Sequence, residues 1–385
     1  MVAVRKASRG EGAIRSLRTW IHAGRFASGQ ELPTEQALAT ELKVSRGTVR
    51  MALQHLREKG LVQSGQGRRH RVVSRTPTSP LSALMANTIL VLCDPYFSPL
   101  PNIHTGLLYS VDSGIQDAIG AMGSSMLRTG GSFLSQALDA IAADPPRGVL
   151  VTEFAANNFA EHRLSRHVQL ARLDSVVNTD AADWHGCDRV VSDHEAGSFE
   201  LTQWLLARGH RRILPLWTNS DHVPETYWIR ARNAGYERAM REAGLPPLAP
   251  LFMAEEKAKV TTERLLAGYL IERLAGPEPV DAILLDSDWH AGTVAAACRI
   301  CGKDPNRDVA IAGYDNVWES LPEDRRAGFS GPVATVDRMN YEVGGEMVRM
   351  LTERAAGQLP PERQCRKMKP RLVVREEAHQ WRGAA

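Results

Sequence analysis

The sequence predicts an α/β protein: a small N-terminal domain with two helices, a turn and a two-stranded wing, then a two-lobed, doubly wound parallel α/β domain. Three observations support this fold class. Residues 32–73 hold two amphipathic segments, each preceded by a helix-capping residue, and then two short strands. From Thr88 onwards, short apolar runs alternate with amphipathic segments, as in a parallel sheet covered by helices on both faces. This second part is too long for one doubly wound sheet, which predicts two lobes.

The N-terminal domain is predicted from its caps and its apolar spacing. Thr34 can cap a first helix, Val44 makes the turn after it, and Ser45 can cap a second helix. The inward face of the second helix carries apolar residues at helical spacing, namely Val49, Ala52, Leu53 and Leu56.

A wing follows the second helix. Gly60 ends that helix, because glycine tolerates a positive φ. Residues 61–64 and 70–73 then pair around the glycine-rich turn 65–68, which can lie close to a phosphate backbone.

The polar face of the second helix is suited to DNA. Arg46, Thr48 and Arg50 lie in its first turns, where a helix entering the major groove presents side chains to base edges. The alternative is a small helical domain with a solvated basic face. Caps, turn, periodicity and charge all agree with the DNA-binding interpretation.

The charge distribution supports the same interpretation. Residues 1–76 contain 15 Lys and Arg against 5 Asp and Glu, a net charge of +10. The rest of the chain contains 32 basic and 39 acidic residues, a net charge of −7. A basic first part on an acidic body is expected when one module binds nucleic acid and the other does not.

Residues 9–74 resemble the winged helix-turn-helix of the GntR family of bacterial transcription regulators. The resemblance rests on Leu32-Pro33-Thr34-Glu35, Val44-Ser45-Arg46, Thr48-Val49-Arg50 and Gly60-Leu61. It implies DNA contacts in the helices and the wing by Gln36, Ser45, Arg46, Thr48, Arg50, Gln66, Gly67 and Arg68. The family often carries an aromatic or Thr-Phe pair after the wing glycines, where this chain has Arg68-Arg69-His70. We therefore expect the wing to contact phosphates rather than read groove shape.

Residues 75–87 are predicted to form a semi-extended linker, because Ser, Thr and Pro dominate the first half of this segment. No apolar run is long enough to span a bilayer, and the N-terminus lacks a hydrophobic signal segment, so we expect a cytoplasmic protein without membrane contact. Five scattered cysteines do not form a disulfide framework. Cys298 and Cys301 form a lone CxxC, which we interpret as core packing.

The histidines show no metal-ligand spacing, and no metal or cofactor is expected. No GxGxxG follows a strand and no GxxxxGK[ST] occurs, which counts against a nucleotide-dependent enzyme. No catalytic residues stand out, so we expect a protein that is not an enzyme.

Residues 88–376 resemble the effector domain of the LacI family, whose fold is similar to that of periplasmic sugar-binding proteins. The resemblance rests on Gly209-His210-Arg211-Arg212-Ile213, on Arg232 followed by Gly235-Tyr236, and on Asp308–Asp315. A GntR-like head on a LacI-like body is similar to the arrangement of arabinose-responsive repressors.

In open α/β sheets, ligands bind beyond the carboxyl ends of the strands, where this chain places Asp94, Asp174, Asp286 and Asp315. The LacI resemblance implies ligand-binding roles for Arg232, Asp286 and Asp315. Tyr96 and Phe97 can stack on the apolar face of a sugar ring. As alternatives, Asp286 and Asp315 cap the following helices, and Tyr96 and Phe97 pack between the lobes.

Together these features predict a ligand-responsive, sequence-specific DNA-binding transcription regulator, a repressor of a carbohydrate-utilisation operon. Its predicted partners are a pseudopalindromic operator DNA, a small sugar bound between the lobes, and a second copy of the chain, because one winged head makes few base contacts. The alternatives are a non-sugar effector such as a nucleobase, a transport binding protein, and an enzyme carrying a DNA-binding module.

Overall fold

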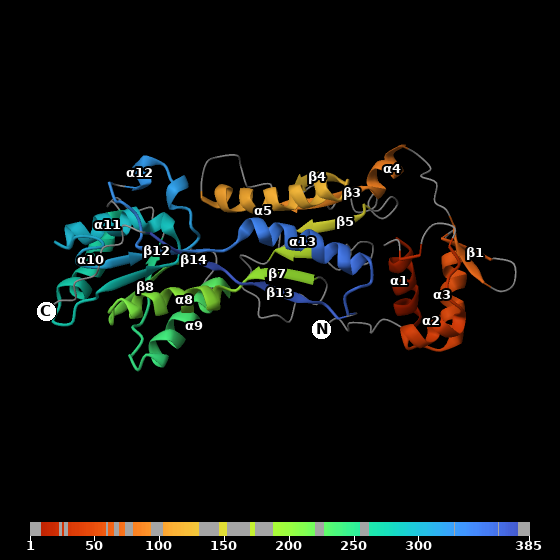
Figure 1. The fold of residues 1–385 in the computed structure, drawn as a ribbon, viewed down its shortest axis with the longest axis horizontal. Helices are drawn as coiled ribbons and strands as arrows, with labels where there is room; N and C mark the ends of the chain where they lie inside the picture. Colours follow the sequence, from red (N-terminus) through yellow and green to blue (C-terminus); the bar gives the residue numbers. More distant parts are fainter. Residues whose placement is uncertain are drawn as a thin grey trace, which may run out of the picture.

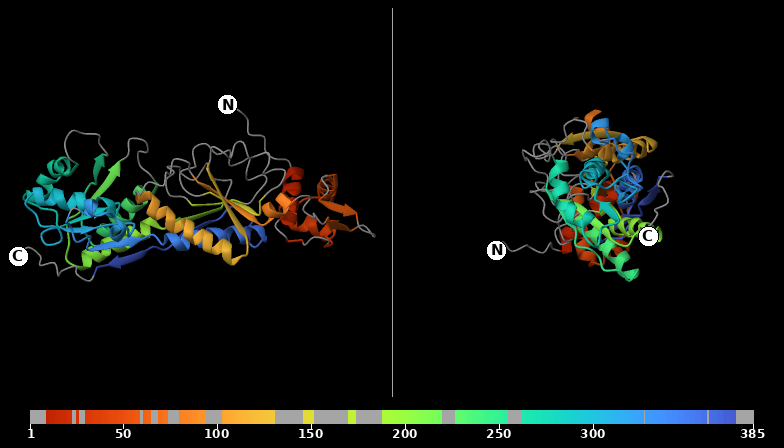
Figure 2. Two further views of the ribbon diagram at one scale, coloured as in Figure 1. Left: turned by 90° about the horizontal axis from the view of Figure 1, so that it is seen from above. Right: turned by 90° about the vertical axis from the view of Figure 1, so that its left-hand side faces the viewer.

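The computed structural model describes three parts of the chain, which lie one after another along its long axis (Figures 1 and 2). The head (residues 9–73) is at one end, the N-lobe is in the middle and the C-lobe is at the other end. The described residues are 9–22, 25–26, 30–58, 61–64, 69–73, 80–93, 103–130, 146–151, 170–173, 188–219, 227–254, 262–326, 328–360 and 362–375. None of the helices in these ranges has both the length and the apolar character that crossing a membrane requires.

The head has the predicted order of elements. Its elements are α1 (Arg9–His22), α2 (Glu35–Leu42), α3 (Arg46–Glu58) and the antiparallel strands β1 (Val62–Ser64) and β2 (His70–Val72). The Thr34 hydroxyl accepts a hydrogen bond from the Ala37 amide at 3.2 Å, and the Ser45 hydroxyl accepts one from the Thr48 amide at 3.1 Å. The apolar residues predicted to face inward on α3, together with Leu17 and Leu38, are buried in one core. The helix-turn-helix with a wing is confirmed.

Within the described ranges, each lobe contains one six-stranded sheet. The N-lobe order is β4 (Ser125–Gly130), β3 (Thr88–Cys93), β5 (Gly148–Val151), β6 (Leu170–Leu173), β7 (Asp188–Ser192) and β13 (Cys365–Met368), all parallel. The C-lobe order is β9 (Leu251–Ala254), β8 (Ile213–Asn219), β10 (Ala282–Leu285), β11 (Ala310–Ala312), β12 (Ala334–Asp337) and β14 (Arg371–Val374). In both sheets the first strand in sequence lies between the second and the third, which is a doubly wound order. The predicted two-lobed fold is confirmed.

One strand departs from the parallel prediction. The last strand, β14, pairs antiparallel to β12, with Thr335 opposite Val373. The chain reaches β14 directly from β13 in the other lobe, without the long crossover that a parallel partner requires.

Helices cover both faces of the C-lobe sheet. Helices α8 (His194–Ala207) and α9 (Tyr227–Glu242) pack on one face, and α10 (Thr262–Ala275) and α11 (Ala291–Ile300) pack on the other. In the N-lobe, α5 (Ile103–Ala121) packs against α13 (Asn340–Ala355), and the two backbones approach closely. A Cβ atom built on Gly114 of α5 would lie 1.9 Å from the Tyr341 carbonyl oxygen, so only glycine fits at this crossing.

Within the part of the chain that the structure describes, three segments cross between the lobes. It passes from β7 into α8, from β12 into α13, and from β13 into β14. The first and third crossings are joined by a hydrogen bond from the Asp193 amide to the Met368 carbonyl at 2.9 Å. Any ligand that binds between the lobes therefore lies beside these crossings.

Helix α4 (Pro80–Ala86) corrects the expected linker conformation. The Ser, Thr and Pro content predicts a semi-extended segment over residues 75–87, but the part that begins at Pro80 is helical. Proline is favourable in the first turn of a helix, and the Leu, Ala and Met residues that follow it are good helix formers. Residues 74–79 lie outside the described ranges.

Candidate functional site

The first candidate site is the exposed face of α3 and its cap. Gln36, Ser45, Arg46 and Arg50 are exposed, whereas Thr48 is half-buried. The Thr48 hydroxyl lies 2.8 Å from the Ser45 hydroxyl, so both side chains take part in the cap of α3. This arrangement leaves the two arginines as the long basic side chains at the start of the helix.

Arg50 forms a two-point contact with Glu35, the first residue of α2. Its Nε donates to Glu35 Oε1 at 3.2 Å, and its Nη2 donates to Oε2 at 2.9 Å. The hydrogen bonds from Arg50 lower the pKa of the Glu35 carboxyl, which holds the pair ionised. Glu35 fixes the direction of the Arg50 guanidinium across the two helices. Glu35 belongs to the family motif, but its contact with Arg50 was not predicted from the sequence.

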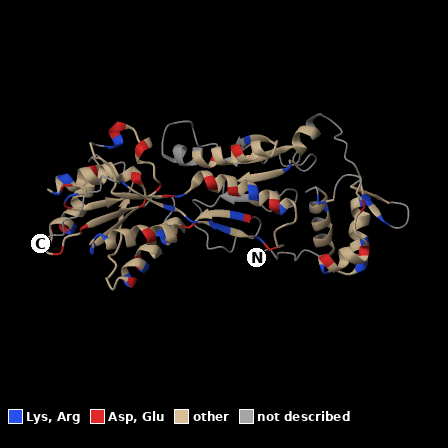
Figure 3. Ribbon diagram, viewed as in Figure 1, with Lys and Arg blue, Asp and Glu red and all other residues tan. Residues whose placement is uncertain are grey.

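The wing contributes further basic residues. Arg69 and Arg71 both pair with Glu31, at 3.1 Å and 3.7 Å. Figure 3 displays Lys and Arg on α3 and on the wing strand β2. The predicted wing contacts Gln66, Gly67 and Arg68 lie outside the described residues.

The second candidate site is centred on Arg232 of α9, at the carboxyl ends of the C-lobe strands. Arg232 is 2% exposed, and its Nη1 donates to the backbone carbonyl of Asp286, directly after β10. Its Nη2 donates to Asp315 Oδ1 at 3.3 Å. The structure thus brings together three of the predicted ligand-binding residues. The other four, Asp94, Tyr96, Phe97 and Asp174, lie outside the described residues.

Aromatic rings flank the Arg232 guanidinium. It lies 3.7 Å from the Tyr314 ring centroid and 4.6 Å from that of Trp228. Cation–π attraction of this kind is strengthened by burial, and it holds the guanidinium in place.

His194 and Arg338 belong to the same cluster, although neither was predicted from the sequence. His194 is buried at the start of α8, and its Nδ1 lies 3.4 Å from Arg232 Nη2. Burial lowers the pKa of His194 well below its usual value, and the charges of Arg232 and Arg338 lower it further. The ring is therefore neutral, and Nδ1 accepts from Arg232, which can only donate. Both missed residues follow strand ends that carry an aspartate, Asp193 and Asp337, and this was the available signal.

The loop that carries Asp315 has an unusual backbone. Asp315 has φ +83° and Asn316 has φ +53°. The Asp315 amide donates to the Val336 carbonyl at 2.8 Å, and the Asn316 amide donates to the Thr335 hydroxyl at 3.3 Å. Anchored backbone strain of this kind is often found at functional sites.

Neither Asp286 nor Asp315 caps the helix that follows it. Ser287, rather than Asp286, caps the 3₁₀ helix Asp288–His290, by accepting from the Trp289 amide at 3.4 Å. The next 3₁₀ helix, Trp318–Ser320, begins after Val317 without a side-chain cap. Asp315 instead faces Arg232.

The cysteine pair packs in the C-lobe. Cys298 is fully buried in the core, and burial raises the pKa of its thiol to about 12. Cys301 packs against the same core. Among the described residues, no three His, Cys, Asp or Glu side chains gather in a way that would hold a metal ion.

Comparison with known proteins agrees with the two kinds of domain. Residues 10–72 match the model for bacterial regulatory proteins of the gntR family, and residues 202–376 match the model for a periplasmic binding protein-like domain. The chain is 25% identical over 276 residues to the HTH-type transcriptional repressor PurR of Vibrio atlanticus (strain LGP32), covering 70% of this chain and 77% of that protein. It is 21% identical over 346 residues to the arabinose metabolism transcriptional repressor of Geobacillus stearothermophilus, covering 88% and 89%.

Solved structures agree with the fold of the two lobes. A LacI family transcriptional regulator from Enterococcus faecium with bound ribose superposes with a TM-score of 0.52 at 18% identity, covering 75% of this chain and 97% of that one. The chain therefore joins a gntR-type winged helix-turn-helix domain to a periplasmic binding protein-like domain of the kind found in LacI-family repressors.

Proposed function

We propose that this protein is a repressor of a carbohydrate-utilisation operon whose affinity for DNA changes when a small sugar binds between its lobes. The observation that carries the proposal is the presence, in one chain, of a winged head and of the buried Arg232–Asp315 cluster beside the lobe crossings. We further propose the boundaries 9–74 for the head, 75–87 for the linker and 88–376 for the effector domain.

The head supports sequence-specific binding to DNA. Arg46 and Arg50 start an exposed helix, and Arg50 is directed by Glu35. A guanidinium held in this way is preorganised for a two-point contact with a guanine in the major groove. The basic wing adds contacts to phosphates, which position the helix without reading sequence. Such binding weakens steeply with salt.

The cluster in the effector domain suits a polyhydroxylated ligand. Arg232 supplies donors, Asp315 supplies acceptors, and the half-buried Trp228 supplies an aromatic ring, which is the combination that recognises a sugar ring. One relative is named for arabinose metabolism, and one structural neighbour holds ribose. These relatives are transcription regulators rather than enzymes, which favours reversible binding over turnover.

We propose that the regulator acts as a homodimer in the cytoplasm. A single winged head reads only a few base pairs, whereas a two-fold dimer reads both halves of a pseudopalindromic operator.

A thermal-shift screen beside a turnover screen tests the effector proposal. L-arabinose, D-ribose and cellobiose are each added to the full chain, and the melting temperature and the chemical state of the sugar are measured. A bound effector raises the melting temperature by mass action and is recovered unchanged. Consumption of the sugar would identify an enzyme, and the absence of any stabilising sugar would favour a nucleobase effector.

A further inference from the structure

Arg338 joins the effector cluster to the N-lobe. It lies between β12 and α13, at the second lobe crossing, and its side chain is 11% exposed. Its Nη1 lies 3.7 Å from Asp315 Oδ1, the same oxygen that accepts from Arg232 at 3.3 Å. The buried Nε of Arg338 has no hydrogen-bond partner among the described residues. One carboxylate oxygen is therefore shared by two arginines, one from the C-lobe helix α9 and one from the crossing that leads into the N-lobe.

This sharing makes Asp315 a point of competition. A ligand hydroxyl that donates to Asp315 must approach an oxygen that already faces both guanidiniums. Arg232 is also held by the Asp286 carbonyl and two aromatic rings, so it has little freedom to move. The Arg338 contact is the longer of the two and has fewer supporting bonds, so it is the contact that ligand binding changes most easily.

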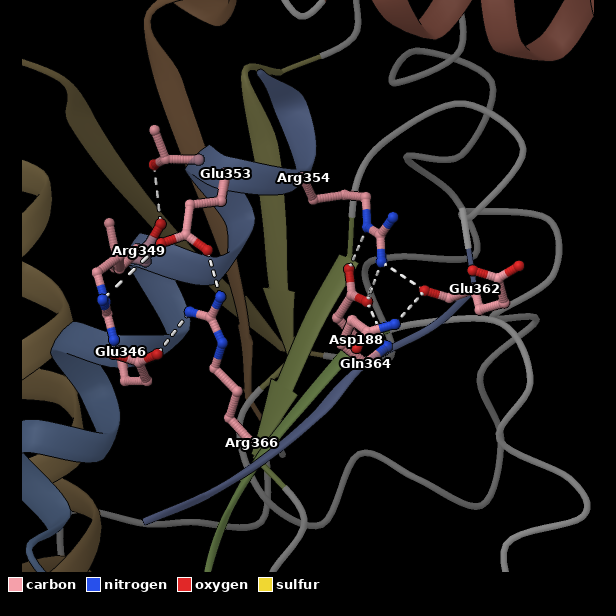
Figure 4. Close-up of polar contacts among 10 residues, drawn as sticks. Asp188, Glu346, Arg349, Glu353, Arg354, Glu362, Gln364 and Arg366 are labelled. Carbon is pink, nitrogen blue, oxygen red and sulfur yellow. Dashed lines mark hydrogen bonds and ion pairs between the residues drawn. The ribbon is translucent and has the colours of Figure 1, made fainter. Parts of the chain in front are cut away.

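Helix α13 begins two residues after Arg338, and residues 346–354 in its second half are joined to the N-lobe sheet by ion pairs (Figure 4). Arg354 near its end donates to Asp188 of β7 at 2.7 Å and 2.6 Å, and Asp188 is 1% exposed. Arg366 of β13 donates to Glu346 of α13 at 2.6 Å and also bonds to Glu353. A displacement at the start of α13 therefore moves the helix and the sheet together.

The far end of α13 touches the head. Gly357 follows the helix with φ +69°, and a Cβ atom built there would lie 3.5 Å from Cδ of Arg25. Arg25 also bonds to Glu41 of α2 and lies 4.2 Å from the ring centroid of Trp20 of α1. One arginine of the head thus lies beside the residue that follows the end of α13 and contacts both of the first two helices. The 16 residues of α13 bridge the distance of roughly 24 Å between the effector cluster and this contact.

We propose that Arg338 is a positioning residue that couples the Asp315 loop to α13, and that α13 carries the state of the effector cluster to the head. This inference rests on the proposed function, because it assumes that the head binds DNA. It assigns the Arg338–Asp315 pair a role in DNA affinity even when no effector is present.

A double-mutant cycle on this pair tests the inference without knowledge of the effector. The variants are R338A, D315N and the double variant, all in the full chain. The probe is a duplex that the wild-type protein selects from a random library, and the dissociation constant is measured by fluorescence anisotropy. We expect R338A and D315N each to shift this constant about fivefold or more in the same direction, near the lower end of allosteric coupling. The double variant should shift it no further, and R338K, which keeps the charge, should restore most of the wild-type value.

R371A is the matched control, since Arg371 pairs with Asp337 of the same crossing at 3.0 Å but is exposed. It should leave DNA affinity unchanged. Wild-type affinity in R338A and D315N, with cooperative melting retained, would overturn the inference, and so would additive shifts in the double variant. If R338A does not fold, R338Q takes its place in the cycle. A wild-type protein that selects no DNA would reject the proposed function itself, and the inference with it.

Discussion

The hydroxyl of Thr335 donates a hydrogen bond to the buried carboxyl of Asp288 at 2.8 Å. The same carboxyl accepts from the Val317 amide at 3.1 Å, and the Asp288 amide donates to the Tyr314 carbonyl at 2.8 Å. Asp288 therefore holds the loop that carries Asp315 by hydrogen bonds to Tyr314 and Val317, on either side of it.

This support predicts a specific dependence of stability on pH. Burial first, and then the charge of Asp315, raise the pKa of Asp288 to about 7. The pKa of Asp288 is higher in the folded protein than in the unfolded chain, where it is near 3.9. The stability that the protonated carboxyl contributes is therefore complete below pH 4 and is lost as the pH rises to 7 and above. The contribution is on the order of 4 kcal/mol. Urea unfolding between pH 5 and 8 should show stability that falls with pH in the wild type and a flatter profile in Asp288→Asn. Parallel profiles would contradict the assignment.

Arg50→Ala should reduce discrimination between DNA sequences. Losing a two-point contact with a base costs roughly 1–3 kcal/mol, and only on the specific site. Anisotropy titrations should therefore show a larger loss on the selected duplex than on random DNA. Arg57→Ala, in the last turn of the same helix, is the control and should affect both duplexes equally. Equal losses of affinity on the two duplexes for Arg50→Ala would show that Arg50 contacts a phosphate rather than a base.

Gly114→Ala should destabilise the N-lobe, because its Cβ would meet the Tyr341 carbonyl and force α5 away from α13. Overpacking of this kind costs roughly 1–3 kcal/mol. The control is Gly120→Ala on the same helix, where a Cβ has no neighbour within 4 Å among the described residues. This change should stabilise the helix by up to about 1 kcal/mol. Thermal melts of both variants distinguish the outcomes, and a neutral Gly114→Ala would contradict the close helix crossing.

Arg232→Gln and Asp315→Asn should weaken the binding of the sugar that stabilises the wild type. Each leaves a polar partner unsatisfied in a buried site, at a cost of roughly 1–3 kcal/mol. Isothermal calorimetry measures the loss. Arg241→Ala, on the exposed face of the same helix, is the control and should bind normally. Wild-type affinity in either site variant would remove that residue from the site.

The sequence predicted the elements well because their signals are local. Caps at Thr34 and Ser45, apolar spacing along α3 and apolar strands each depend on residues close in the chain. Arg232 and Asp315 were chosen by motif, and the structure brings them to 3.3 Å.

The contacts that were not predicted from the sequence have a common physical cause. His194 and Arg338 enter the cluster only because the chain crosses between lobes next to both, and the number and position of the crossings depend on strand order. The Arg50–Glu35 pair depends on the angle between two helices rather than on spacing within one. The antiparallel β14 follows from the third crossing. Contacts of this kind join segments far apart in the sequence, and no local pattern encodes them.

The central claim is that sugar binding in the effector domain changes DNA binding by the head. The most direct measurement is the dissociation constant of the wild-type protein for its selected duplex, with and without a saturating concentration of the sugar that raises its melting temperature. The account predicts a change of about fivefold or more in that constant. An unchanged constant, with the sugar shown to be bound by calorimetry, would contradict it.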